Sequence, residues 1–456
     1  MSESNLRQAG HYRLNQFRVY DFKRTKSVDL KLLVHTFNIS ESMSTGAVRG
    51  SAVVYDTGDL IKNFPFVCEE YLEITYTDFF DVEHTDRMFI YSITDIKYPK
   101  EKSQSMIEYK LNFVSLSRAF SEDFRVQKAY RPNGTNAGLI SGYVKEVFDE
   151  YYVKPLLEYG IEPKTIDVET TAGQTNYVIP RLTPEHTMQF FARRAFNSSS
   201  NSTQTFRFFE SREKYYFASN DWMATVGVDI VGNSTVIPQV DVGLAQAAGL
   251  REKVVPVFRL NYLPDLSPDK QESLMYELIS INYGIRANTI EDINVGGYKR
   301  RTWEIDMLNG AVTSRDYDHT QAFSTENVKL IHTPDFINNR MQKYRERFAF
   351  IDYAPVGAPT GPALRPDQNY ADLYNIKATN FYHYDRNKIT IQIYGRNTLF
   401  AGDVLDLQIF EHSASNELRL DEDRSGYYLI ESIDNVFFES VYTQNIVLSR
   451  NGIGAQ

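Results

Sequence analysis

A strand pattern near the C-terminus recurs near the N-terminus, and this recurrence constrains the fold more than any other feature of the sequence. Residues 389–449 contain four short segments of alternating apolar and polar residues, the pattern of half-buried β-strands. Corners that contain Gly395 and the pair Gly402-Asp403 separate the first two segments. Four such strands with glycine corners predict a small antiparallel barrel or sandwich sheet.

Residues 51–115 show the same order of segments. Residues 90–96 match residues 430–436, with Ser-Ile at the same place in both, and residues 111–114 match residues 444–447. The order of the segments, the glycine turn and the Ser-Ile pair recur together. We therefore predict an internal duplication: two similar antiparallel β-barrel domains with the remaining chain inserted between them. The alternative is that any two four-stranded meanders share this alternation.

Between the two predicted barrels the apolar spacing becomes helical. Residues 139–151 have this spacing and follow Asn136, a residue type favoured at helix N-caps. Thr183-Pro184-Glu185 has the order of cap, first-turn proline and acidic first turn, so a second helix is predicted to start there. Residues 206–217 predict a hairpin with its turn at 211–214. Helices and hairpin together predict a compact α+β insert.

The predicted fold class is therefore mixed and β-rich (α+β). We predict helices at residues 267–279, 336–347 and 370–381, the last leading directly into the second barrel. The predicted regions are a first β-barrel domain over residues 1–120, the α+β insert over 121–225, an interrupted middle region over 226–385 that contributes to the second barrel and carries a further insert, and the second β-barrel over 386–456.

Charge and composition exclude some classes of protein. The formal net charge of −10 argues against a surface that grips nucleic acid, which needs clustered Lys and Arg. No run of eighteen apolar residues occurs and the N-terminus is polar, so we expect synthesis in the cytosol and no membrane insertion. Cys68 is the single cysteine, is expected to be buried, and fits a reducing compartment.

Catalytic chemistry is not evident in the sequence. The eight histidines lack metal-site spacing, and Gly296-Gly297 is followed by Tyr298 rather than by a phosphate-loop lysine. The carboxylates at 421–423 or Glu69-Glu70 could form a glycosidase pair, but solvated loops and strand edges explain them more simply. We therefore predict no enzyme activity, and no catalytic, cofactor or metal site. The residues singled out are structural turns: Gly395, Gly402 and Asp403.

Taken together, barrel, helix-plus-hairpin insert and second barrel, with Gly395, Leu399, Gly402-Asp403 and a terminal pair of strands, resemble the central tail-hub proteins of contractile-tailed phages. Hub portions of related injection machines have the same fold class. Residues 183–194 and the following hairpin also resemble the insert of that family, whereas residues 226–370 do not align with it.

This resemblance implies two tube-like barrels in a structural virion protein at the tail baseplate, made in the host cytoplasm. It implies a homotrimer that adapts the sixfold tail tube to a threefold central spike, contacts surrounding baseplate proteins and lets DNA pass without specific binding. Spike-fused members of the family carry octad repeats or a lysozyme domain. This chain has neither, which implies a separate spike protein.

A second hypothesis is a carbohydrate-binding or carbohydrate-active β-rich protein, in which tyrosine-rich sheets form a sugar cleft. The 31 tyrosines allow this because tyrosine presents an apolar ring with a polar tip. A pocket with two carboxylates flanked by Tyr or Trp would favour this hypothesis over the hub.

Overall fold

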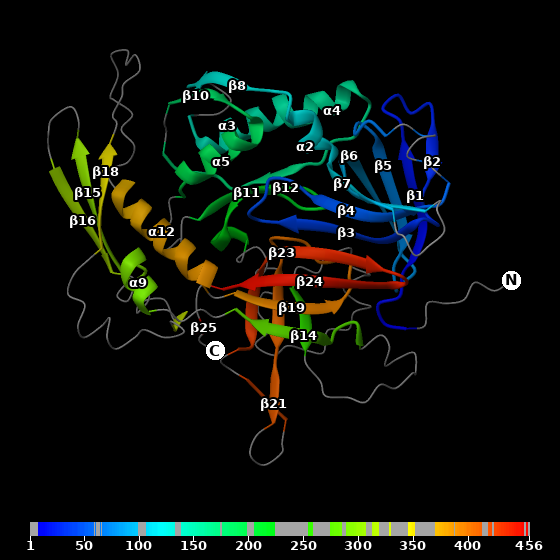
Figure 1. Ribbon diagram of the computed structural model, residues 1–456. Helices are drawn as coiled ribbons and strands as arrows, with labels where there is room; N and C mark the ends of the chain where they lie inside the picture. The colour runs from blue at the N-terminus through cyan, green and yellow to red at the C-terminus, as the bar shows by residue number, and fades with distance from the viewer. Residues whose placement is uncertain are drawn as a thin grey trace.

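The structure is a computed structural model, and the fold is β-rich with helices packed beside and between its sheets (Figure 1). It describes residues 8–58, 60, 64, 66–98, 106–132, 138–173, 176–197, 205–223, 254–258, 274–284, 289–306, 312–318, 328–329, 345–351, 370–386, 388–412, 418–421, 424–450 and 453–454.

A 13-stranded sheet forms the centre of the molecule and contains two groups of strands. The N-terminal group follows the order β3-β4-β7-β6-β5-β1-β2. Its strands are β1 (Arg13–Tyr20), β2 (Ser27–Asp29), β3 (Val34–Ser42), β4 (Arg49–Asp56), β5 (Tyr71–Thr77), β6 (Glu83–Lys97) and β7 (Ile107–Ser115). The C-terminal group follows the order β14-β19-β24-β23-β20-β13. Its strands are β13 (Val254–Phe258), β14 (Leu278–Tyr283), β19 (Lys388–Tyr394), β20 (Val404–Gln408), β23 (Gly426–Phe438) and β24 (Val441–Ser449).

The two groups have corresponding strand orders. In sequence order and in pairing, β14, β19, β24, β23 and β20 take the places of β3, β4, β7, β6 and β5, and every neighbouring pair is antiparallel in both groups. The sixth strands differ, since β1 is antiparallel to β5 and β13 is parallel to β20. The pairings of the named strands branch at β23, which pairs with β24, β20 and β3, and they close neither group into a barrel. An isolated bridge between His11 and Val441 joins the segment before β1 to β24.

Two β-bulges occur at corresponding places. One interrupts β6 between Ile90 and Ser92 and β23 between Ile430 and Ser432, which matches the predicted alignment of residues 90–96 with 430–436. The other lies in β3 after Val34 and in β14 after Leu278. A bulge changes which face each following side chain occupies, so its position is a sensitive marker of register.

The predicted alignment of the following strand is wrong by two residues. Leu111 pairs with Ile93 and Ile446 pairs with Ile433, so Leu111 corresponds to Ile446 and not to Gln444. A shift of two residues keeps every side chain on the same face of a strand, so alternation in the sequence does not reveal it.

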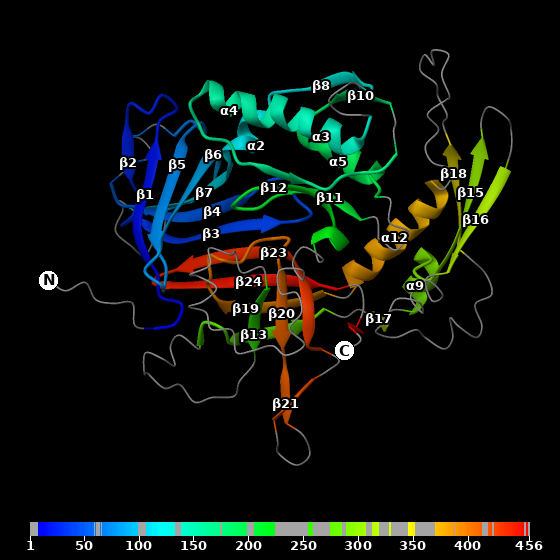
Figure 2. The same ribbon diagram turned by 180° about the vertical axis from the view of Figure 1, so that it is seen from behind.

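β23 joins the two groups because its second half also pairs with β3, with Asp434 opposite Ser40 and Phe437 opposite Phe37. Phe437 lies between the rings of Phe37 and Tyr442, with centroid distances of 4.3 and 4.2 Å. Figures 1 and 2 show β3, β4, β23 and β24 side by side through the middle of the molecule. The core of the N-terminal group is therefore completed by two residues from the C-terminal group, Phe437 and Tyr442.

The α+β insert covers the upper side of this sheet in Figure 1. α5 begins at the predicted place: Thr183 precedes it, and the Thr183 hydroxyl accepts a hydrogen bond from the His186 N–H at 3.3 Å. The hairpin predicted at 206–217 is formed by β11 and β12. The helix predicted after Asn136 is α3, which starts at Ile140, and Asn136 lies outside the described residues. The elements of this region are α2 (Leu116–Ser121), β8 (Val126–Tyr130), α3 (Ile140–Phe148), the π-helical η1 (Asp149–Val153), α4 (Lys154–Glu158), β9 (Ile166–Val168), β10 (Tyr177–Leu182), α5 (Pro184–Arg194), β11 (Phe206–Glu210) and β12 (Tyr215–Ser219).

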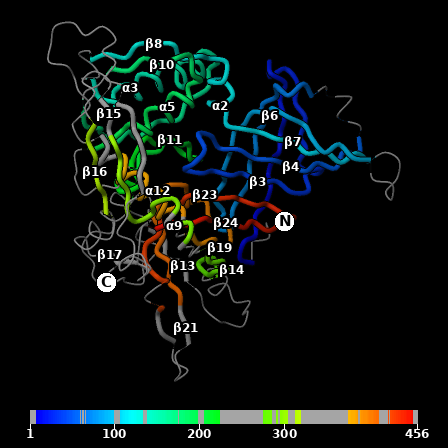
Figure 3. Tube along the Cα trace, turned by 60° about the vertical axis from the view of Figure 1, so that its left-hand side comes forward, coloured from blue at the N-terminus to red at the C-terminus, as the bar shows by residue number. Residues whose placement is uncertain are grey.

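A smaller sheet lies beyond α12, on the far side of the molecule from β1 and β2 (Figures 1 and 3). The helix predicted at 370–381 is α12, and its Lys377 ammonium donates to the carbonyl oxygens of Ala192 and Arg193 at 2.7 and 3.0 Å. This amino group satisfies carbonyls at the C-terminal end of α5 and ties α12 to the insert. The elements here are α9 (Thr289–Val295), β15 (Lys299–Asp306), β16 (Val312–Asp318), β18 (Arg345–Ile351) and α12 (Tyr370–Arg386). Two further two-stranded sheets pair β17 (Val328–Lys329) with β25 (Ile453–Gly454) and β21 (Phe410–His412) with β22 (Leu418–Leu420).

Two helix predictions in the middle region are wrong where the structure describes them. Residues 278 and 279 belong to strand β14, and residues 345–347 belong to strand β18. Both are short segments in which apolar residues fit either period, and pairing with a neighbouring strand decides the outcome. The predicted burial of Cys68 is also wrong, because the side chain is only partly covered and its backbone has a φ of +65°.

Candidate functional site

A buried polar cluster lies where the insert meets both strand groups. We call it the junction and define it as Glu41, Tyr76, Asp86, Arg212 and Asn397. Arg212 comes from the turn between β11 and β12, which is closed by a hydrogen bond from the Ser211 N–H to the Lys214 carbonyl at 2.8 Å. This short turn projects one long cationic side chain toward the central sheet.

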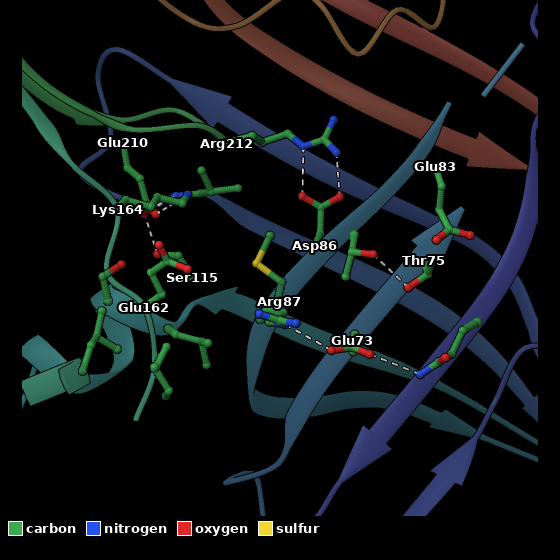
Figure 4. A pocket seen from close by; sticks show the side chains of 18 of the residues that line it. Glu73, Thr75, Glu83, Asp86, Arg87, Ser115, Glu162, Lys164, Glu210 and Arg212 are labelled. Atoms are coloured by element: carbon green, nitrogen blue, oxygen red, sulfur yellow. Dashed lines mark hydrogen bonds and ion pairs between the residues drawn. The ribbon is translucent and has the colours of Figure 1, made fainter. Parts of the chain in front are cut away.

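Arg212 bonds elements from three parts of the chain. Its guanidinium contacts Asp86 of β6 through two nitrogens, at 3.2 and 2.6 Å. The same group donates to the Tyr76 hydroxyl at 2.7 Å and to the Asn397 side-chain oxygen at 3.0 Å. Figure 4 shows the paired contact between Arg212 and Asp86. Because the Arg212 side chain is 8% exposed, these contacts replace its solvation rather than adding to it.

Glu41 of β3 binds the backbone of the same turn. One carboxylate oxygen accepts from the Arg212 N–H at 2.7 Å and the other from the Ala401 N–H at 3.2 Å. Burial raises the pKa of Glu41 to about 7, against the opposing effects of these hydrogen bonds and the Arg212 charge. Glu41 therefore connects the insert turn to the corner before Gly402.

Hydrogen bonds extend from the junction into the C-terminal group. The Tyr442 hydroxyl donates to Asn435 at 2.6 Å, and Gln444 donates to the same Asn435 oxygen at 2.8 Å. Gln444 also donates to the Arg396 carbonyl and accepts from the Arg396 N–H, at 2.8 and 2.9 Å. These bonds fix the loop that carries Asn397.

A cavity of about 640 Å³ opens beside the junction, between β5, β6 and the insert (Figure 4). Its fully buried carboxylate, Glu210, accepts from Lys164 at 2.7 Å, from the Ser115 hydroxyl at 2.5 Å and from the Val48 N–H at 3.1 Å. The lining contains no Tyr, Phe or Trp among the described residues. The acidic side chains named here are bound by protein cations and donors, which is the arrangement of a domain contact.

The three residues singled out in the sequence lie at corners beside this junction. The Gly395 N–H donates to the Tyr442 carbonyl at 2.8 Å, and an added Cβ would lie 2.1 Å from the Tyr442 ring. Gly402 has a φ of +90°, and its added Cβ would lie 2.2 Å from Cε of Met223. Asp403 accepts from the Phe400 N–H at 3.0 Å through its side chain. Gly395 is thus constrained by crowding, and Gly402 by both backbone conformation and crowding.

Sequence reasoning missed the residues that make the junction. Arg212 was placed in a hairpin turn, where a charged side chain is ordinarily solvated. Asp86 and Glu41 lie on the inward faces of β6 and β3, but their residue types are those of solvated positions. A signal for Glu41 was its phase, because it follows Phe37 and Ile39 at the alternate positions that face the core of β3. None of these residues carries a motif with fixed spacing.

We expect Gly402→Ala to destabilise the chain more than Gly160→Ala. Both glycines have positive φ, which costs a residue with a Cβ about 1–2 kcal/mol. Only at Gly402 does the added carbon meet packed side chains, which adds roughly 1–3 kcal/mol. Denaturant unfolding of both variants measures the difference, and equal losses would show that crowding at Gly402 is relieved without cost.

A pH-dependent contribution to stability follows from Glu41. Its folded-state pKa is about 7, above the ordinary value of 4.5, so the folded state holds this proton more tightly than the unfolded state. The contribution is fully present below about pH 4.5 and is lost as pH rises through 7. We expect the stability of the wild type relative to Glu41→Gln to fall by about 3 kcal/mol between pH 4.5 and 8. A difference that does not vary with pH would contradict the raised pKa.

Neither a metal-binding group nor a membrane-spanning helix is found in the described part of the chain. No group of three or more His, Cys, Asp or Glu side chains is placed to hold a metal ion there. No described helix is both long and apolar enough to cross a bilayer.

In sequence comparisons, no family model and no curated protein matches this chain. By structure it is similar to a tail protein from Neisseria meningitidis MC58, with a TM-score of 0.51 and 10% identity over 98% of each chain. A 43 kDa tail protein of prophage MuSo2 from Shewanella oneidensis gives a TM-score of 0.49 and 9% identity over 97% of this chain and 98% of the other. The first likeness shows that this chain has the fold of that tail protein, in agreement with the resemblance predicted from the sequence.

Proposed function

We propose that this chain is the central hub of a contractile-tail baseplate and acts as a structural homotrimer in the virion. The observation that carries the proposal is the pair of strand groups with corresponding order and bulges, which supports an internal duplication of one tube-like domain. The tail-protein fold supports the same proposal. In this reading the junction holds the insert in one orientation on the two domains.

The duplication explains how such a hub can match two symmetries. Three copies around one axis present six similar domains, threefold in sequence and nearly sixfold in shape. One end can therefore contact a sixfold tail tube and the other a separate threefold spike protein, with other baseplate proteins around the ring. A chain of net charge −10 would leave passing DNA unbound.

The test is the mass and shape of the purified protein. Sedimentation analysis should show a trimer, and particle images should show a ring that binds purified tube protein on one face and spike protein on the other. A stable dimer or tetramer, alone or with its partners, would remove the adaptor role. A trimer without a central opening would contradict DNA passage while leaving the assembly role.

The carbohydrate hypothesis finds less support. It needs two carboxylates flanked by Tyr or Trp, whereas the described cavity is lined by no such ring and Glu210 is bound to Lys164. We propose that the protein is not an enzyme. Assays on peptidoglycan, casein and polysaccharides should show no turnover, and turnover abolished by Glu210→Gln would overturn this proposal.

A further inference from the structure

The connection between β20 and β23 is longer than its counterpart between β5 and β6. The two pairs correspond in register, because the shared bulge in β6 and β23 places Tyr71 of β5 and Val404 of β20 at equivalent positions. β5 and β6 stay paired as far as Thr77 and then join through a short turn. The pairing of β20 with β23 ends at Leu407 and Gly426, and the chain continues into the hairpin of β21 and β22. Each chain therefore carries this hairpin in one strand group and only a turn in the other.

We call the hairpin of β21 and β22 the arm. Figures 1 and 2 show it projecting away from the central sheet, beyond the end of β20. Because residues alternate between the two faces of a hairpin, the register assigns each residue to a face. One face takes Phe410, His412, Leu418 and Leu420, and the other takes Glu411 and Arg419. We call the first of these the apolar face of the arm.

The base of the arm is held by hydrogen bonds. The Ile409 carbonyl accepts from the Asp421 N–H at 2.8 Å, and the Ile409 N–H donates to the Ser425 hydroxyl at 2.9 Å. The Asp421 side chain is buried and accepts from the Arg424 N–H at 3.0 Å. The Arg450 guanidinium, which follows β24, donates to the Ser425 carbonyl at 3.2 Å. The base therefore fixes the direction of the arm before a partner binds, which lowers the entropy lost on binding.

We propose that the arm docks on the separate threefold spike protein through its apolar face. This inference rests on the proposed trimeric hub and assigns one of its two partners to a surface. The C-terminal group has the arm where the N-terminal group has a turn, so the two groups differ at this place. A trimer thus presents three arms, which matches a threefold partner and breaks the match to a sixfold one.

Charge defines the surface that the spike protein must offer. Residues 410–424 contain five acidic residues and two arginines. The receiving surface should therefore be an apolar groove with Lys or Arg at its rim. Binding of the spike protein should weaken as the salt concentration rises, because rim charges are screened.

The first test removes the arm and keeps its base. Replacing residues 411–419 with Asn-Gly leaves Phe410 and Leu420 joined by a two-residue hairpin turn. Sedimentation should still show the trimer, and the affinity for purified tube protein should equal that of the wild type. The affinity for purified spike protein should fall about thirtyfold or more, as for the loss of an interface hot spot. A shortened trimer that binds the spike protein like the wild type, or that loses the tube protein instead, overturns the arm proposal and leaves the hub standing.

Two double variants decide the question if the shortened chain does not assemble. Leu418→Ser/Leu420→Ser removes the leucines of the apolar face and should weaken spike binding about thirtyfold or more. Glu411→Ser/Arg419→Ser is the matched control, because it clears the other face at unchanged net charge. It should change spike binding by less than about fivefold. Equal affinities of the two variants for the spike protein overturn the arm proposal, whereas a wild type that binds no spike protein overturns this inference and the adaptor role together.

Discussion

Replacing Arg212 with methionine is expected to lower the free energy of unfolding by about 3–5 kcal/mol. Methionine keeps the length of the side chain but removes the charge, which leaves the Asp86 carboxylate without its cation in a site that is 12% exposed. Tyr76 and Asn397 each lose a hydrogen bond as well. Because these partners belong to different parts of the chain, the loss should appear as weaker docking of the insert.

Arg87→Met is the matched control. Arg87 is the next residue of β6 and pairs with Glu73 at 3.1 Å, but its side chain is largely exposed. Exposed ion pairs contribute about 0–1 kcal/mol, so this variant should unfold almost as the wild type does. Equal losses from the two variants, measured by denaturant unfolding, would show that burial of the Arg212–Asp86 pair has no special effect.

Phe437→Ala should have an effect of similar size, about 3–5 kcal/mol. The ring is fully buried between Phe37 and Tyr442, and Tyr12 and Tyr76 contact it edge to face at 5.0 and 4.8 Å. Its removal leaves a cavity at the point where β23 pairs with β3, so the two strand groups lose their shared core. Hydrogen exchange should then increase in both β3 and β23.

Phe438→Ala tests whether position or residue type matters. Phe438 is the next residue and is also a phenylalanine, but it points to the other face of β23 and is 46% exposed. We expect a loss well below that of Phe437→Ala, of about 1 kcal/mol or less. Comparable losses would indicate that the aromatic character of the strand, and not the shared core, determines stability here.

Part of the fold could be predicted because it depends on local pattern. Alternation and glycine corners located the strands, and residues 90–96 aligned correctly with 430–436 because a bulge occupies the same place in both. The alignment at Leu111 was wrong by two residues because side chains two positions apart lie on the same face of a strand. The pairing of β23 with β3 could not be predicted, since it depends on the packing of distant segments and leaves no signal in either one.

The candidate site shows the same limit. Gly402 could be singled out because a tight corner favours glycine, and it lies at a positive φ. Arg212, Glu41 and Asp86 have the residue types of solvated positions, and only the folded arrangement buries them together. Their importance comes from burial, which a single sequence does not record for a charged residue in a turn or strand.

The pairing of β3 with β23 also determines when the edge of the N-terminal sheet is covered. The hydrogen bond from Asn435 to Ile39 spans 396 positions of the chain, so β3 leaves the ribosome long before its partner is made. At about 5–20 residues per second, this interval lasts roughly 20–80 seconds. During this interval, a nascent chain that has already folded its first strands presents an unpaired strand edge to other nascent chains on the same messenger RNA. Slow translation or early termination should therefore favour aggregation of this protein, and fragments that end before residue 426 should require a chaperone to stay soluble.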